Sequence, residues 1–308
     1  RNSRTMASTV TARVVDPLRK IVGAENVLTS ASERLVYECD GFMVEKNSPD
    51  VVVFPTSTDQ VAAIVKACNE AQVPFLPRGA GTSLAGGCLA VGGGVMIVLT
   101  RMKEILQINL RDHYAVVQPG VVNVWLTQAL KGSGYHYAPD PSSQKACSLG
   151  GNIAENAGGP HCLAYGTTTN HVLGMEVVLE DGTVINLGSL ARETVGYDLR
   201  GVFTGSEGTF GIATKISVRL LPVPEAVRTF LGIFPDVETA CTAVSAVIEH
   251  GIVPAALEMI DALTIQAVQK VSDAGYPDDA GAVLLIELEG LQDEVDEIGE
   301  EVEAALWE

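Results

Sequence analysis

Three glycine-rich segments are the residues best suited to chemistry in this sequence. The first, PRGAGTSLAGG at residues 77–87, holds four glycines at positions 79, 81, 86 and 87. Small residues let successive backbone N–H groups converge on an anion, because little side-chain bulk stands in the way. This segment therefore predicts a phosphate or pyrophosphate site, although the same glycines could also serve only to turn a tight bend.

Two further segments strengthen the prediction of a ligand. CSLGGNIAENAGG occupies residues 147–159, and GSEGTFGI occupies residues 205–212, directly before a predicted strand. Glycine loops this far apart in the chain, all without bulky side chains, suit a large flat ligand between two lobes. Together the three segments predict one extended ligand.

Two familiar phosphate-binding motifs fit poorly. A dinucleotide-binding βαβ fold needs its GxGxxG to open a helix after a strand, whereas residues 77–87 join two predicted strands. The nucleotide-binding P-loop needs Gly-Lys-Ser/Thr, and no lysine lies between Lys66 and Lys103. The P-loop is therefore excluded, and the dinucleotide fold is a minor alternative.

The elements before the first glycine segment form a predicted βαβ unit. A strand at 51–54 precedes an S-x-x-Q capping box at 57–60, which marks the start of a helix. Apolar residues spaced by three and four then give that helix one buried face. A second strand follows at 73–76, and another at 95–99.

Later segments predict a mixed α and β chain with a boundary at Pro222–Pro224. Asp181-Gly182 is a hairpin turn between two apolar runs, and residues 212–220 alternate as a half-buried strand does. We predict a first domain over 14–224, with lobes at about 14–105 and 106–224, and a second over 225–308. Further strands are expected at 105–109, 114–118, 173–180, 183–187, 229–234, 256–259 and 282–288, helices at 122–130, 237–250 and from 291, and irregular chain at 138–166.

Composition excludes several classes of function. The 308 residues carry 20 Lys plus Arg against 38 Asp plus Glu, a formal charge of −18, which repels nucleic acid and anionic membrane surfaces. No apolar stretch approaches the roughly 20 residues of a membrane helix. Six cysteines without a CxxC pair predict neither a disulfide framework nor an iron–sulfur or zinc site. A reduced cytoplasmic compartment is expected.

Five segments in this order resemble a known family. They are PRGAGTSLAGG at 77–87, PDPSS at 139–143, CSLGGNIAENAGGPHCLAYG at 147–166, LGMEVVLEDG at 173–182 and DLRGVFTGSEGTFGI at 198–212. The set resembles flavoproteins of the vanillyl-alcohol oxidase type with a PCMH-type FAD domain. More narrowly, it is similar to the flavin subunit of glycolate oxidase and to D-lactate and D-2-hydroxyglutarate dehydrogenases.

The resemblance implies an α+β fold, a two-lobed PCMH-type FAD-binding domain followed by an incomplete ferredoxin-like cap domain. It implies oxidation of a small 2-hydroxy acid, of the glycolate or D-lactate type, with hydride passing to flavin N5. Alternatives are a catalytically silent FAD-binding fragment, or an alkyl-glycerone-phosphate synthase or cell-wall reductase on the same fold. Some members tether the flavin through a histidine where this chain has Thr82 and Ser83, so the FAD is expected to be noncovalent.

The resemblance also assigns cofactor contacts residue by residue. The stretch 78–83 wraps the pyrophosphate, residues between 139 and 158 line the isoalloxazine and ribityl end, and two later residues contact the adenine end. In full, the implied cofactor residues are Pro77, Arg78, Gly79, Ala80, Gly81, Thr82, Ser83, Pro139, Asp140, Ser148, Gly150, Gly151, Asn152, Asn156, Ala157, Gly158, Gly208 and Ile212.

The histidines leave the catalytic group undetermined. His161 lies in GGPHCLAYG and could stabilise charge on the reduced flavin, or could hold the loop in place. His113, His136, His171 and His250 are dispersed, without HxH or HxxxH spacing, so no metal site is predicted.

Related flavoproteins continue into a segment with a basic substrate clamp and an HxGDGNxH-like motif. Neither is found before Glu308, so the chain is expected to be the N-terminal part of a longer protein. The resemblance to glycolate oxidase also implies a separate iron–sulfur subunit as the electron acceptor, since this chain has no cysteine cluster of its own.

Overall fold

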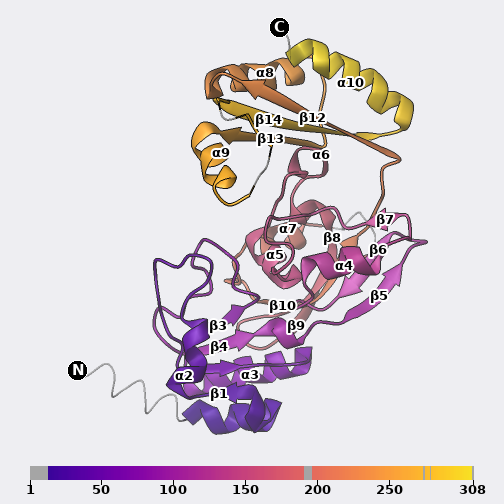
Figure 1. The fold of residues 1–308 in the computed structure, drawn as a ribbon. Coiled ribbons are helices and arrows are strands. Elements are labelled where there is room, and N and C mark those ends of the chain that lie inside the picture. Colours follow the sequence, from indigo (N-terminus) through magenta and orange to yellow (C-terminus); the bar gives the residue numbers. More distant parts are fainter. Residues whose placement is uncertain (1–12, 191–195, 273–274, 278, 307–308) are drawn as a thin grey trace. The chain divides into compact units, whose positions relative to one another are not determined.

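The computed structural model describes residues 13–190, 196–272, 275–277 and 279–306, which form two compact units (Figure 1). Among these residues, the first unit comprises the chain up to Ala157 and Thr168–Leu221. The second comprises Gly158–Thr167 and the chain from Pro222 onward. The segment 158–167, which the sequence analysis includes in the first domain, thus packs with the second unit.

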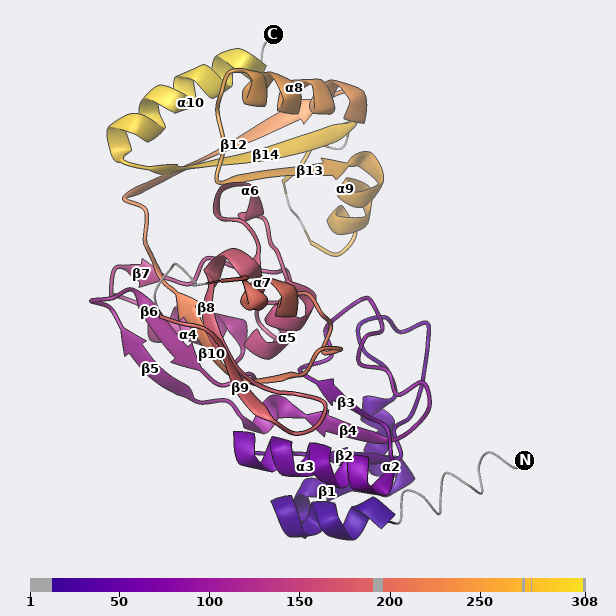
Figure 2. The ribbon, with the colours of Figure 1, turned by 180° about the vertical axis from the view of Figure 1, so that it is seen from behind.

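The first unit opens with a four-stranded sheet in the order β1-β2-β4-β3. The strands are β1 (Val27–Leu28), β2 (Val51–Val53), β3 (Phe75–Arg78) and β4 (Val95–Val98). β4 runs parallel to both β2 and β3, so the predicted βαβ unit has a third strand between its two. Helix α3 (Thr58–Ala71) connects β2 to β3 and packs against this sheet (Figure 2).

Local hydrogen bonds define both ends of helix α3. The Ser57 hydroxyl accepts from the Gln60 backbone N–H at 3.3 Å, as the capping box predicts. At the other end Gln72 takes a left-handed conformation, with φ of +54°, and Val73 N–H bonds back to Cys68 O. Val73 therefore completes the helix end, and β3 begins two residues later than predicted.

A five-stranded antiparallel sheet follows in the order β5-β6-β10-β8-β9. Every strand lies within two residues of its predicted position. Its buried face packs against helices α4 (Asn123–Ala129) and α5 (Leu149–Glu155), around Leu126, Leu149 and Ile216. The strands are β5 (Ile105–Asn109), β6 (Tyr114–Val117), β8 (Val172–Val178), β9 (Val184–Gly188) and β10 (Ile212–Arg219).

Short elements complete this part of the chain. Residues 13–22 are helical, and α4 (Asn123–Ala129) is confirmed where a helix is predicted. The others are η1 (Ala24–Asn26), α2 (Ala31–Arg34), η2 (Leu35–Tyr37), η3 (Leu99–Arg101), β7 (Tyr135–His136), η4 (Thr168–His171), α7 (Leu199–Phe203) and β11 (Leu221–Pro222).

The stretch 138–166 is not wholly irregular, and that prediction is wrong. It contains α5 (Leu149–Glu155) and the single turn α6 (Cys162–Tyr165). Ser148 caps α5 by accepting from the Gly151 N–H, and Asn156 ends it with φ of +48°. Glycines inside a helix weaken its sequence signal, while burial of Leu149 and Ile153 stabilises it in the fold.

The second unit alternates strands and helices. Its sheet has the order β12-β14-β13, with β14 antiparallel to both neighbours, which is a split β-α-β arrangement. Helices α8 and α10 cover one face of this sheet. The elements are β12 (Ala226–Phe234), α8 (Val237–Glu249), β13 (Ala256–Asp261), α9 (Ala262–Gln269), β14 (Ala282–Gly290) and α10 (Gln292–Leu306). All except α9 are predicted, and the α+β class is confirmed.

Glu176 on β8 ties α3 to the second sheet. Thr58 Oγ1 donates to its carboxylate at 2.6 Å, and Lys215 Nζ lies 3.2 Å away. Burial opposes ionisation, but these hydrogen bonds outweigh it and lower the pKa of Glu176 below its ordinary 4.5. Because the pKa of Glu176 is lower in the folded than in the unfolded chain, its ionised carboxylate stabilises the fold at pH values above the ordinary pKa. This stabilisation is lost as the pH falls through the lowered pKa.

We expect Glu176→Gln to destabilise the first unit by about 1–2 kcal/mol at neutral pH, because charge-assisted bonds become neutral ones. Urea unfolding at neutral and acidic pH measures this difference, which should shrink in acid. Glu180→Gln, at an exposed position in the turn after β8, is the matched control. A difference that persists unchanged in acid would contradict the ionised-Glu176 account.

Candidate functional site

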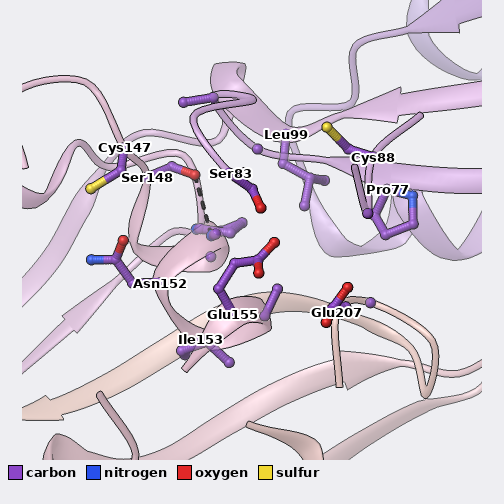
Figure 3. A pocket seen from close by; sticks show the side chains of 18 of the residues that line it. Pro77, Ser83, Cys88, Leu99, Cys147, Ser148, Asn152, Ile153, Glu155 and Glu207 are labelled. Atoms are coloured by element: carbon purple, nitrogen blue, oxygen red, sulfur yellow. Dashed lines mark hydrogen bonds between the residues drawn. The ribbon is translucent and has the colours of Figure 1, made fainter. Parts of the chain in front are cut away.

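The first unit contains a cavity of about 310 Å³ lined by all three glycine-rich segments (Figure 3). The loop after β3 forms one wall, α5 another, and the chain before β10 a third. Thirteen of the eighteen residues that the resemblance assigns to the cofactor line it, namely Pro77, Gly79, Ala80, Gly81, Thr82, Ser83, Ser148, Gly150, Gly151, Asn152, Ala157, Gly208 and Ile212.

Arg78 is not among the lining residues. Its guanidinium lies 5.7 Å from the Tyr37 ring centre and donates to Cys88 Sγ at 3.4 Å. Gly81 passes directly over it, since a Cβ on Gly81 would lie 2.1 Å from Arg78 Nη2. Arg78 therefore supports the glycine loop from behind.

Four more assigned residues lie outside the lining, and two of them bond to neighbouring chain segments. Pro139 O accepts from Asn123 Nδ2 at 2.9 Å, and Asn156 Oδ1 accepts from the Thr169 N–H at 2.9 Å. Asp140 is half-buried beside Pro139, and Gly158 belongs to the second unit.

Glycine is required where the cavity walls meet. A Cβ on Gly79 would lie 2.5 Å from Ser148 Oγ, so the first loop touches the start of α5 only because Gly79 has no side chain. Gly208 has φ of +77°, and its Cβ would lie 2.7 Å from Pro77 Cγ. Backbone therefore faces the cavity from two directions, as the sequence predicts for a ligand that contacts main chain.

A buried donor in the α5 wall fits a polar ligand. Asn152 is 2% exposed, and its amide nitrogen has no hydrogen-bond partner among the described residues. An unsatisfied buried donor is costly, whereas a ligand oxygen or nitrogen would satisfy it. The Gly150 and Gly151 N–H groups are already bonded, to Pro119 O and Ser148 Oγ, so Asn152 is the free donor on this helix.

The sequence analysis did not single out two carboxylates in the cavity, Glu155 and Glu207. Both approach Gly87, whose Cβ would lie 3.1 Å from Glu207 Oε2 and 3.8 Å from Glu155 Oε1. Carboxylates repel phosphate but accept from hydroxyl groups, so this part of the wall suits the hydroxyl groups of a ligand. Both acids stand inside the glycine-rich segments, whose predicted role rests on their small residues.

Cys88 also lines the cavity and was not predicted. Burial raises the pKa of its thiol to about 11, although Arg78 beside it acts in the opposite direction. The thiolate is the reactive form, so Cys88 is protonated and unreactive at neutral pH.

We expect iodoacetamide at mildly alkaline pH to label Cys241, an exposed cysteine, well before Cys88. Labelling of Cys88 should accelerate only as pH rises toward its raised pKa. Peptide mass spectrometry over a time course gives both rates within one sample. Faster labelling of Cys88 than of Cys241 would contradict the protonated-thiol assignment.

His161 does not line the cavity of the first unit. It belongs to the second unit, where its Nε2 lies 2.8 Å from Glu287 Oε1 on β14. Neighbouring Tyr165 donates to Glu289 on the same strand. The candidate catalytic histidine is therefore held by carboxylates that lie more than a hundred positions later in the sequence.

No helix among the described residues is both long and apolar enough to cross a membrane.

Comparison with known families identifies both parts of the chain. Residues 49–188 match the family described as FAD binding domain, and residues 223–307 match the C-terminal domain of FAD linked oxidases. The chain is 47% identical over 289 residues to the glycolate oxidase subunit GlcD of Escherichia coli (strain K12), covering 94% of this chain and 58% of that protein. It is 36% identical to the D-lactate dehydrogenase of Anaerostipes hadrus, covering 91% and 59%.

A solved structure of an alkyldihydroxyacetonephosphate synthase has the same fold, with a TM-score of 0.85, 21% identity, and coverage of 96% of this chain and 59% of that one. This chain thus spans a little under three fifths of each of these proteins. The family matches and the cavity formed by the glycine-rich segments agree. Residues 49–188 belong to the FAD binding domain family, residues 223–307 belong to the family of C-terminal domains of FAD linked oxidases, and the cofactor is FAD.

Proposed function

We propose that the cavity of the first unit holds FAD noncovalently and that the protein to which this chain belongs oxidises a small 2-hydroxy acid to the 2-oxo acid. The observation that carries the proposal is the convergence of three glycine-rich segments on one cavity. The names of the relatives, glycolate oxidase subunit and D-lactate dehydrogenase, support the substrate class.

The residues of the cavity have distinct roles in this proposal. The loop from Gly79 to Ser83 would bind the pyrophosphate through backbone N–H groups and hydroxyls, and Asn152 would donate to a polar atom of the cofactor. Glu155 and Glu207 would accept from hydroxyls. When bound, FAD supplies the acceptor for the hydride that leaves the substrate Cα.

Proton removal needs a base within hydrogen-bond reach of the substrate hydroxyl. No histidine, lysine, arginine or tyrosine is among the described residues that line the cavity. The carboxylates in the cavity, Glu155 and Glu207, are assigned above to hydroxyl groups of the cofactor. Among the described residues, the cavity therefore has no further side chain to act as the base, which favours the alternative that the chain binds FAD but turns over slowly.

Anaerobic mixing of the FAD-loaded chain with glycolate, D-lactate or D-2-hydroxyglutarate tests the activity, and loss of the visible flavin absorbance is the readout. We expect 2-hydroxy acids, and not 3-hydroxypropionate, to reduce the flavin. The expected rate is lower than in the E. coli relative by at least the ~10²-fold that a positioned acid or base contributes.

No reduction by any 2-hydroxy acid, with FAD still bound, would show that this chain is a silent flavin-binding module. Rates equal to those of the longer relative would show that the base lies within the chain. In that case His161 would be the first residue to replace.

The electron acceptor is proposed to be a separate subunit with an iron–sulfur cluster. The relative from E. coli is itself named a subunit, and cysteines do not gather into a metal-binding group among the described residues. Co-purification of the chain with a protein that contains iron and acid-labile sulfide would support this partner, and an iron-free partner that reoxidises the flavin would contradict it.

A further inference from the structure

The sheet of the second unit places two glutamates side by side on its central strand. Glu287 and Glu289 are two residues apart on β14, so their side chains leave the same face. The intervening Ile286 and Leu288 point the other way, into the core with α8 and α10. The two carboxylates therefore lie on the face opposite those helices.

The segment 158–167 brings a histidine to the same face. His161 is the N-cap residue of α6, which packs against β13, and Tyr165 N–H bonds to His161 O at 3.0 Å. This single turn places the two rings on one side, with centroids 6.4 Å apart. Each glutamate has its own partner: His161 Nε2 lies 2.8 Å from Glu287 Oε1, and Tyr165 donates to Glu289.

The resulting group has the composition of a metal site. One ligand atom each from His161, Glu287 and Glu289 lies within 4.8 Å of the others, and all three residues are half-buried. An imidazole with two carboxylates suits divalent transition metals such as Zn²⁺ and Mn²⁺. The net charge of −18 further favours cation binding over anion binding.

We propose that His161, Glu287 and Glu289 bind one divalent transition-metal ion. Ligands at about 2.0–2.2 Å from one ion lie about 3 Å from one another, close to the 2.8 Å between His161 Nε2 and Glu287 Oε1. Rotation of the Glu289 side chain would bring in the third ligand atom. Tyr165 donates a hydrogen bond to Glu289. It would orient Glu289 through one oxygen and leave the other for the metal.

This assignment replaces the expectation that the chain holds no metal. The ion would tie the segment 158–167 to β14 and leave coordination positions open to water or another ligand. It does not depend on the redox function, because only residues of the second unit bind the ion.

The test is a titration of the full chain with Mn²⁺ after treatment with a chelator. The electron paramagnetic resonance signal of the free ion measures how much Mn²⁺ remains unbound. Mn²⁺ is chosen because it prefers oxygen and nitrogen ligands to thiolates, which excludes binding by the six cysteines. We expect one Mn²⁺ per chain, displaced by Zn²⁺ as the stability order of these metals requires. His161→Asn and Glu289→Gln should each weaken binding at least ~10-fold.

Matched controls are Glu297→Gln, at an exposed position on α10, and His250→Asn after α8. Both should leave the affinity unchanged. Circular dichroism and FAD retention show whether each variant is folded. If a ligand variant is misfolded, Tyr165→Phe is tested in its place, and it is expected to weaken Mn²⁺ binding less than loss of a ligand does. Absence of stoichiometric Mn²⁺ binding, or equal affinity in the ligand and control variants, would overturn the proposal.

Discussion

Gly81→Val is expected to abolish retention of FAD during gel filtration. Gly81 has φ of +74°, a conformation that a β-branched side chain avoids, and its Cβ would lie 2.1 Å from Arg78 Nη2. The loop must then move away from the cavity and lose two or three backbone contacts to the pyrophosphate. At about 1.5–3 kcal/mol for each charged hydrogen bond, the expected loss of affinity exceeds ~10²-fold.

Gly92→Val is the matched control, because it introduces the same side chain into the same connection between β3 and β4. No atom lies within 4 Å of a Cβ at Gly92, and its φ is not in the left-handed region. Fluorescence titration of both variants with FAD gives the comparison. Equal affinities would contradict the assignment of this loop to the pyrophosphate.

Gly150→Ala is expected to destabilise the first unit by about 1–3 kcal/mol, as overpacking of a filled core does. A Cβ there would lie 2.6 Å from Pro119 Cβ and 3.0 Å from Pro119 O. Pro119 cannot retreat easily, because Gly120 beside it already packs against the backbone of Leu99 and Met102. Helix α5 would have to shift, and with it the cavity wall that holds Asn152.

Gly151→Ala in the same helix provides the contrast for this prediction. Its Cβ would meet only Ser148 Oγ, at 3.2 Å, and replacing glycine by alanine within a helix favours the helix by about 0.5–1 kcal/mol. Urea unfolding of both variants without FAD should therefore show losses of stability only for Gly150→Ala. Equal stability of the two variants would show that α5 is not held against Pro119.

Local patterns in the sequence predicted the larger elements well. The alternation over 212–220 predicted β10 (Ile212–Arg219) to within one residue, because one face of that strand is buried along its whole length. Helix α5 was missed, since its stability comes from Leu149 and Ile153 packing in the core rather than from its glycine-rich sequence.

The site was predicted only in part, because the sequence shows local patterns but not contacts between distant segments. Glycines that bring backbone to a cavity are visible in one segment at a time. The three glycine-rich segments line one cavity, together with thirteen of the residues that the resemblance assigns to the cofactor. Contacts between distant segments have no such signal. His161 and Glu287 are 126 positions apart, so their pairing is visible only in the folded chain.

Titration of the flavin-free chain with FAD, FMN and riboflavin tests the central claim that the cavity is an FAD site whose glycine loop binds the pyrophosphate. The account predicts one FAD per chain, bound at least ~10²-fold more tightly than riboflavin because of the charged hydrogen bonds to phosphate, with FMN between them. Equal affinities for FAD and riboflavin, or no binding of FAD at all, would contradict it.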